Sequence, residues 1–373
     1  MKIGIITLPF DSNFGGIIQC YALQEIIKKL GHDVYIIKHS KLSPPRRLDF
    51  PIRYLIYFKR FLDKYICHKN IDVFVDLKAR ERFPKKLQNN NIFIKTHMTI
   101  WDIRDHTSDE LNFFDCFIVG SDQVWRPIYA IPIEKYYLKF AEDKAHIRRI
   151  AYAASFGTDK WEYSEKQTAE CARLAQKFDL ITVREDSGIK LCQDNFGVKA
   201  VHVLDPTMLL NKEDYIALIA QEKIPKSSGN LFAYMLDNNE LKQSYVEKVA
   251  SKLALNPFTI IPTDKELDEG KAFPGVTTWL RSFMDADFIV TDSFHGCVFS
   301  IIFNKPFIAV GNMGRGQDRF DSLFRLFQLQ DRLVDISNLS ISNLPDPIDW
   351  TKVNSIWQKM KKQSIALLSN SLT

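Results

Sequence analysis

Several features that mark specialised classes of protein are missing from this 373-residue sequence. It has six cysteines, but it contains no C-x-x-C pair or other metal-ligand spacing. Four of the six lie in apolar surroundings, which favours reduced, buried thiols over a framework of disulfides. No run of about 18 apolar residues is present, so we expect no membrane-spanning helix. A lysine and a strand-like run stand where a signal peptide would have its apolar region, and we therefore expect a cytoplasmic protein.

A strong charge of one sign is also missing, since the net charge of +5 is small for this length. Such a charge permits an anionic substrate, or a peripheral contact with acidic lipid on the inner face of the membrane, but it does not indicate a nucleic-acid partner. The composition, 46% hydrophobic and 25% charged, is ordinary for a globular protein. Because the chain exceeds the size at which one core usually stops growing, we expect two domains.

The first part of the chain alternates the patterns of strands and helices. A strand at 1–8, a helix at 17–30 and a strand at 33–38 predict a βαβ unit, and therefore a parallel sheet. Further strands are predicted at the ranges 113–119, 148–154, 180–183 and 201–204. Each ends in small or polar residues, and parallel strands bring such ends to one edge of a sheet, where ligands bind.

Residues 40–107 form a basic and aromatic insertion in this alternation. Its helices either lie on a membrane surface or bind an acidic partner, or they form an amphipathic insertion packed on the sheet. Packing on the sheet is the more common arrangement, and we expect it here.

A second alternating set follows a polar loop, with strands at 231–235, 258–261, 288–290 and 307–310 and helices at 240–253 and 277–284. We predict an N-terminal Rossmann-like domain at 1–210, a C-terminal one at 211–345, and a last helix within 346–373 that packs back on the first domain. The predicted fold class is α/β and GT-B-like, with two doubly wound domains facing a central cleft. Periplasmic binding proteins share this plan, but the start of the chain disfavours that class.

Residues 286–306 are the centre of the predicted site. The strand at 288–290 stops at the run TDSFHG, within which a helix of apolar residues begins. Asp292 or Ser293 can cap this helix, and its unpaired N–H groups favour an anion. We expect Ser293 to contact the substrate. His295 lies on the first turn, where its imidazole either contacts a ligand or only hydrogen-bonds backbone.

Motifs spread over most of the chain resemble those of the polysaccharide pyruvyl transferase family. In the order of the family they are NFGG and QCYALQ within 13–24, GSDQVW at 120–125, SFG at 155–157, VREDS at 183–187, DPT at 205–207 and TDSFHG at 291–296. They span about residues 3–330, and GSDQVW and DSFHG are the most specific of them.

This resemblance implies a GT-B-like fold and a transferase that uses phosphoenolpyruvate (PEP) as co-substrate. Such an enzyme moves the enolpyruvyl unit of PEP onto a sugar, forms a pyruvate ketal and releases phosphate, without a metal or a nucleotide cofactor. The implied acceptor is a sugar of a capsule, exopolysaccharide or cell-wall glycan that is still attached to a lipid or a nucleotide.

On the donor side, Arg184 matches the family's arginine in the VREDS motif and is expected to grip the acidic groups of PEP. Ketal formation requires protonation of the PEP methylene carbon. A histidine has an ordinary pKa suited to that step, so His295 is the candidate acid. Binding of the leaving phosphate is an alternative role for the same imidazole.

The loop after the strand at 307–310 carries Asn312, Arg315 and Arg319. We expect them to face the cleft from the second domain, or else the arginines flank a turn at the surface. Many relatives have Arg-Leu-His where this chain has Ser-Phe-His. A subgroup of the family also has Ser-Phe-His, and the chain resembles that subgroup. Whether the subgroup uses PEP is open. Arg315 is the candidate for replacing the missing cation.

The acceptor sugar is expected on the first-domain side. The residues expected to line it are Asn13, Gly15, Gly16, Ser121, Asp122, Gln123 and Trp125. Trp125 would offer a face for stacking, and Asp122 is either a base for the acceptor hydroxyl or a cap of a loop or helix.

Two other functions are compatible with the sequence. A GT-B glycosyltransferase in capsule synthesis would bind a nucleotide sugar, but we identify neither an acidic residue for the ribose nor a pocket for the base. The other is a non-catalytic, glycan-binding member of the same assembly. The oligomeric state is not indicated by the sequence.

Overall fold

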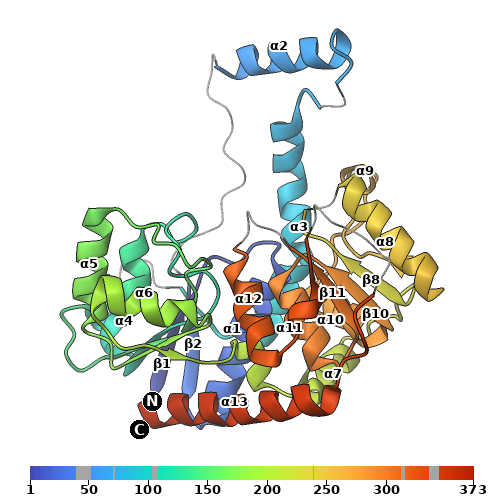
Figure 1. The fold of residues 1–373 in the computed structure, drawn as a ribbon. Coiled ribbons are helices and arrows are strands. Elements are labelled where there is room, and N and C mark those ends of the chain that lie inside the picture. The colour runs from blue at the N-terminus through green and yellow to red at the C-terminus, as the bar shows by residue number, and fades with distance from the viewer. Residues whose placement is uncertain (39–51, 70–71, 103–107, 238, 312–315, 336–343) are drawn as a thin grey trace.

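Two parallel β-sheets carry the fold of the computed structural model (Figure 1). The structure describes residues 1–38, 52–69, 72–102, 108–237, 239–311, 316–335 and 344–373. The predicted fold class, α/β and GT-B-like with two parallel sheets, is confirmed. We call the seven-stranded sheet with its helices the first lobe and the five-stranded sheet with its helices the second lobe.

The first lobe has the strand order β3-β2-β1-β4-β5-β6-β7. Its strands are β1 (Lys2–Ile6), β2 (Asp33–Lys38), β3 (Ile100–Asp102), β4 (Cys116–Val119), β5 (Arg148–Ala154), β6 (Leu180–Val183) and β7 (Val201–His202). Its helices are α1 (Phe14–Lys29), α3 (Val75–His97), α4 (Ser108–Asn112), α5 (Glu165–Ala175) and α6 (Ser187–Phe196). Ile3 and Ile5 of β1 pack in the core that contains α1, whereas Ile6 packs in the core that contains α5 and α6. Both faces of the sheet are therefore covered, as in doubly wound folds.

The second lobe has the strand order β12-β11-β10-β8-β9. Its strands are β8 (Leu231–Tyr234), β9 (Pro257–Phe258), β10 (Phe288–Thr291), β11 (Phe307–Val310) and β12 (Leu333–Val334). Its helices are α7 (Lys212–Gln221), α8 (Glu240–Leu253), α9 (Asp264–Asp268), α10 (Val276–Asp285), α11 (Phe294–Ile302) and α12 (Asp318–Phe327). The first sheet ends at His202 and the second begins at Leu231, so the predicted boundary near residue 210 falls in the connection.

Aromatic packing joins the two lobes at the start of α1. The ring of Phe14 stacks on Trp279 of α10 with centroids 5.7 Å apart, and on Phe273 at 5.8 Å. The last helix, α13 (Trp350–Ser371), runs along the base of the molecule (Figure 1). Its Trp357 indole donates to the Met208 carbonyl at 2.7 Å, and Arg148 donates to the carbonyl of Ser371 at 2.8 Å.

Several predicted bounds differ from the structure; the strands predicted at 113–119 and 201–204, for example, are shorter. Helix α1 begins at Phe14 rather than Ile17, because the glycine pair that reads as a loop forms its first turn. The strand expected at 258–261 is only Pro257–Phe258.

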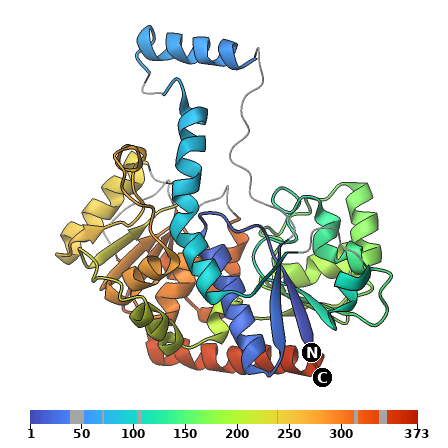
Figure 2. The same ribbon diagram turned by 180° about the vertical axis from the view of Figure 1, so that it is seen from behind.

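The insertion is only partly packed on the sheet, so the expectation for it is wrong in one half. The end of α3 lies against α1, with the rings of Tyr21 and Phe93 5.6 Å apart. By contrast, α2 (Ile52–Tyr65) stands at the far end of α3, away from both sheets (Figures 1 and 2). Among the described helices, none combines the length and apolarity that crossing a bilayer would need.

Candidate active site

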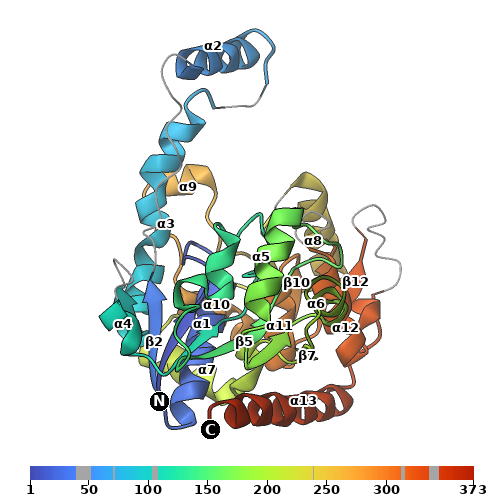
Figure 3. The ribbon, with the colours of Figure 1, turned by 90° about the vertical axis from the view of Figure 1, so that its left-hand side faces the viewer.

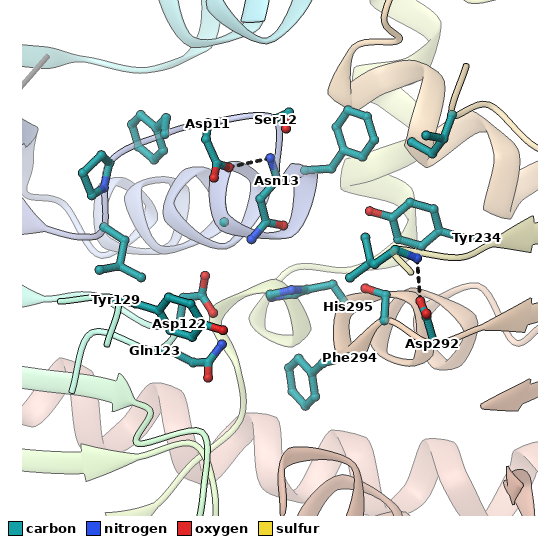
Figure 4. Close-up of a pocket in the computed structure, with 18 of the residues that line it drawn as sticks. Asp11, Ser12, Asn13, Asp122, Gln123, Tyr129, Tyr234, Asp292, Phe294 and His295 are labelled. Carbon is teal, nitrogen blue, oxygen red and sulfur yellow. Dashed lines mark hydrogen bonds between the residues drawn. The ribbon is translucent and has the colours of Figure 1, made fainter. Parts of the chain in front are cut away.

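A cavity of about 630 Å³ lies where the carboxyl ends of the two sheets meet (Figure 4). Its first-lobe wall is the loop 7–14 after β1 together with Gly16, Asp122, Gln123 and Tyr129. Its second-lobe wall includes Tyr234 to Leu236 after β8, Asp292 to His295 after β10, and Arg319 of α12. Lys86 of α3 completes the lining on the insertion side. Open parallel sheets bind ligands in such a crevice.

Helix α11 brings His295 into this cavity on its first turn. Of the two candidate caps, Ser293 caps the helix, since its Oγ accepts from the backbone N–H of Gly296 at 3.3 Å. Asp292 instead accepts from the backbone N–H of Leu236 at 2.6 Å and from the ammonium of Lys242 at 2.5 Å. The carboxylate therefore links the ends of β8 and β10, while the hydroxyl starts the helix.

The imidazole of His295 points across the cavity toward Asn13 and Asp122 (Figure 4). It lies directly against Gly15 of α1, where an added Cβ would come within 2.1 Å of Nδ1. The glycine is thus required for the close approach of α1 and α11, and it supports the ring rather than lining the cavity. Within the described residues Nε2 of His295 is buried without a hydrogen-bond partner.

Asp205 is the carboxylate nearest to that nitrogen, with its Oδ2 3.6 Å from Nε2. The same oxygen accepts from Arg184 Nη1 at 3.0 Å and from Ser121 Oγ at 3.2 Å. Burial alone would raise the pKa of Asp205, but the adjacent His295 and Arg184 hold it well below the ordinary value. An ionised, buried carboxylate therefore lies close to the imidazole.

Arg184 lies behind the cavity wall and is not among the residues that line it. It is buried, and it pairs with Asp205, with Glu185 at 3.1 Å and with Asp122 at 3.6 Å. Burial alone would lower the pKa of Arg184, but these three carboxylates raise it. The prediction that Arg184 grips the substrate directly is therefore wrong. Its charge instead neutralises and positions the carboxylates behind the site.

Arg319 is an arginine that does line the cavity. Burial, together with repulsion from Arg184, lowers its pKa to about 10. Both cations lie against the ring of Phe294, whose centroid is 4.5 Å from Cζ of Arg184 and 5.6 Å from Cζ of Arg319. Arg319 thus supplies a cation to the cavity that His295 also lines. Arg315 and Asn312 lie outside the described residues.

The GSDQVW motif reaches the cavity with only two of its side chains, Asp122 and Gln123. Asp122 adopts a left-handed backbone conformation with φ of 70°, and its carbonyl accepts from the N–H of Ser155 at 3.1 Å. This turn directs Trp125 into the first-lobe core. There its indole donates to the Tyr136 carbonyl at 3.0 Å and stacks on Tyr137. The prediction that Trp125 offers a face to a sugar is therefore wrong.

Ser121 is also buried and does not line the cavity, because its hydroxyl is bonded to Asp205. Asn13 and Gly16 line it as expected.

Among the lining residues missing from the sequence prediction are Asp11, Lys86 and Tyr129. Tyr129 follows the GSDQVW motif by four residues and supplies the aromatic face expected from the tryptophan. Burial raises the pKa of Asp11, and the charge of Asp122 acts in the same direction. In the sequence, Asp11 and Tyr129 are indicated as lining residues only by their position next to recognised motifs. Lys86 lies in the insertion, and no motif marks it. Over the described ranges, no group of three or more His, Cys, Asp and Glu side chains is placed to hold a metal ion.

Solved structures with a similar chain path are enzymes that act on nucleotide sugars or transfer sugars. A UDP-N-acetylglucosamine 2-epimerase from Rickettsia bellii is 8% identical, with a TM-score of 0.43 and coverage of 99% of this chain and 97% of that one. The corresponding epimerase of Methanocaldococcus jannaschii is 11% identical, with a TM-score of 0.43 and coverage of 97% and 93%. A glycosyltransferase from a Streptomyces species is 11% identical, with a TM-score of 0.42 and coverage of 99% of both chains.

No curated protein sequence matches the chain. The model of one family, described as polysaccharide pyruvyl transferase, matches residues 13–313. This range begins at Asn13 in the cavity wall and includes His295, so it contains most of the chain and part of both walls of the site. The chain belongs to the polysaccharide pyruvyl transferase family.

Proposed function

We propose that this protein transfers the enolpyruvyl unit of PEP onto a sugar, forming a pyruvate ketal and releasing phosphate. The observation that carries the proposal is the place of His295. Its Nε2 is buried without a hydrogen-bond partner among the described residues, in a cavity that both lobes line. A buried polar atom of this kind costs free energy unless a ligand satisfies it.

The charges around the cavity suit an acidic donor. PEP carries a phosphate and a carboxylate, and the guanidinium of Arg319 and the ammonium of Lys86 both line the cavity. The first turn of α11 adds backbone N–H groups that favour an anion. Burial and the charge of Arg184 lower the pKa of Arg319, and an anion beside it would favour its charged form.

The chemistry then divides between the two walls. His295 donates a proton to the methylene carbon of PEP, and a sugar hydroxyl forms a bond to the adjacent carbon, which bears the phosphate. Phosphate leaves, and a second hydroxyl of the same sugar bonds to that carbon to close the ketal. The sugar loses two hydroxyl protons in total. One replaces the proton that His295 gave to the methyl group, and the other leaves with phosphate. Asp122, on the opposite wall, is the candidate acceptor of a hydroxyl proton.

Asp205 and Arg184 act through His295 rather than on the substrate. The carboxylate of Asp205 lies 3.6 Å from Nε2 and orients the imidazole. Arg184 holds that carboxylate in place at 3.0 Å. Both are positioning residues.

The first-lobe wall suits a sugar. Tyr129 offers an aromatic face, and Asn13 and Gln123 offer amide groups for hydroxyls. The acceptor in this proposal is a sugar of a surface glycan that is still attached to a lipid or nucleotide carrier. PEP serves as co-substrate, without a metal or nucleotide cofactor, and the protein works in the cytoplasm, where PEP is made.

The test is phosphate release by the purified protein given PEP and a galactose- or mannose-type acceptor, followed by mass spectrometry of the acceptor. We expect His295→Ala to slow the reaction at least about 100-fold, as loss of a general acid does. The exposed His146 provides the matched control, and His146→Ala should leave the rate unchanged. Tight binding of UDP or GDP without any response to PEP would instead favour a nucleotide-sugar transferase.

A further inference from the structure

Helix α2 carries an apolar face whose side chains are largely exposed. Tyr54, Phe58, Phe61 and Tyr65 follow one another at intervals of three and four residues, so they lie on one side of the helix. Their exposed fractions are 56%, 63%, 49% and 57%. We call these four residues the aromatic face; Leu55 beside it is 69% exposed. A helix of a globular domain usually turns such a face toward the core.

The polar side of α2 makes the contacts to the rest of the chain. Tyr57 Oη donates to Oδ2 of Asp76 at 2.7 Å, and Arg60 Nη1 donates to Oδ1 of the same residue at 2.9 Å. Arg60 also bonds the carbonyl of Val73 at 3.3 Å. These bonds attach α2 to the start of α3, at the end far from both sheets (Figure 2). The helix is therefore held by its polar side with the aromatic face outward.

The charge of α2 distinguishes between the surfaces that can cover this face. Its charged residues are Arg53, Lys59, Arg60, Asp63 and Lys64. A second copy of α2 would bring two basic helices together, which is unfavourable. Negatively charged lipid headgroups would instead attract the basic residues while the aromatic face enters the boundary of the acyl chains. At 14 residues the helix is about 21 Å long, which suits lying along a bilayer rather than crossing it.

We propose that α2 docks the protein on an anionic lipid surface through its aromatic face. Helix α3 then sets the distance between that surface and the active site. Lys86 lines the cavity 11 residues after Val75, the first residue of α3, which corresponds to about 17 Å of helix. Strand β2 points toward the side on which α2 lies, so the carboxyl ends of the first sheet face the same way (Figure 3).

This orientation turns the cavity toward the bilayer. It specifies the class of acceptor, a sugar carried by a membrane lipid; this step rests on the proposed function, whereas lipid binding by α2 does not.

The experiment is co-sedimentation of the full chain with two kinds of vesicle, phosphatidylcholine alone and phosphatidylcholine mixed with phosphatidylglycerol. We expect binding to the anionic vesicles and much weaker binding to the neutral ones. The double variant Phe58→Ser/Phe61→Ser should reduce the partition coefficient by more than about tenfold, because it removes two buried rings from the lipid boundary. Lys59→Gln and Lys64→Gln should each reduce it by about fivefold.

The matched control is Ile189→Ser/Leu241→Ser, which removes two exposed apolar side chains from α6 and α8. It should leave the partition unchanged. Equal binding of wild type and the Phe58→Ser/Phe61→Ser variant would overturn the proposal. So would a concentration-dependent dimer in sedimentation velocity that this double variant abolishes, since the face would then bind a second copy.

Enzyme assays separate this inference from the proposed function. The Phe58→Ser/Phe61→Ser variant should keep wild-type turnover of a water-soluble acceptor and lose turnover of the same sugar on a lipid in vesicles. Loss with both acceptors would contradict a role in docking alone. Absence of PEP turnover in every protein, with vesicle binding intact, would refute the proposed function and leave lipid binding by α2 standing.

Discussion

Arg184 and Arg319 both lie against the ring of Phe294, yet their electrostatic surroundings differ. Arg184 pairs with three carboxylates, and its pKa is raised by them. Arg319 lines the cavity, and burial with repulsion from Arg184 lowers its pKa to about 10. The charge of Arg184 lies among these carboxylates, whereas that of Arg319 lies in the wall of the cavity. Two buried arginines that contact one ring thus differ in the groups that set their pKa values.

The largest expected effect is that of Arg184→Met. The change leaves Asp205, Glu185 and Asp122 without their shared counter-ion in a buried position. Breaking a buried ion pair from one side typically costs about 3–5 kcal/mol of unfolding free energy. Urea denaturation should show this loss, and activity should fall with it. A variant as stable as wild type would mean that the three carboxylates are protonated or hydrated instead.

The same substitution at the other arginine, Arg319→Met, should leave stability unchanged or slightly higher, because the folded state disfavours this charge. The KM for PEP should rise about 10- to 100-fold, as expected for the loss of a charged hydrogen bond to an anion. Steady-state kinetics with varied PEP measures it, and titration of the acceptor provides the control. A normal KM for PEP combined with a raised KM for the acceptor would contradict this assignment, and would mean that Arg319 contacts the acceptor rather than PEP.

Phe294 couples the two arginines, and Phe294→Leu tests that contact. A cation over an aromatic face contributes about 0.5–2 kcal/mol. A double-mutant cycle of Phe294→Leu with Arg319→Met should give a coupling free energy in that range. Phe303→Leu, at the other end of α11, is the matched change of a buried ring. Its cycle with Arg319→Met should give no coupling.

The smallest expected effect concerns Asp318, which neighbours Arg319 and accepts from Ser187 of the first lobe at 2.5 Å. Burial raises its pKa to about 6, so the folded state binds this proton more tightly than the unfolded chain does. Its contribution to stability is therefore complete below about pH 4 and is lost as the pH rises through about 6. Relative to Asp318→Asn, wild type should lose about 1–2 kcal/mol over that interval, after allowance for solvent screening. A constant difference between the two proteins would contradict the raised pKa.

How far the sequence predicts the site depends on how local each arrangement is. Ser293 and His295 are predicted correctly as cap and first-turn residue, because a strand that runs into a helix is a local pattern. The strands β2, β5 and β11 have the predicted bounds for the same reason. Trp125 is not predicted, since its direction depends on the left-handed turn at Asp122 and its bond to the next strand.

The role of Arg184 is not predicted correctly, for a related reason. Two of its carboxylate partners, Asp205 and Asp122, are far away in the sequence, and only the fold brings them together. The sequence likewise predicts that α2 is a helix, but it does not predict the direction in which its apolar face points. Amphipathicity predicts two faces of a helix without predicting which one contacts the protein.

The central claim, proton transfer from His295 to PEP during ketal formation, is tested most directly by running the reaction in deuterium oxide. Mass spectrometry of the acceptor should show a pyruvate ketal whose methyl group carries one solvent deuterium. His295→Ala should form it at least about 100-fold more slowly. An acceptor that stays unmodified with PEP, or a ketal without deuterium, would contradict the account.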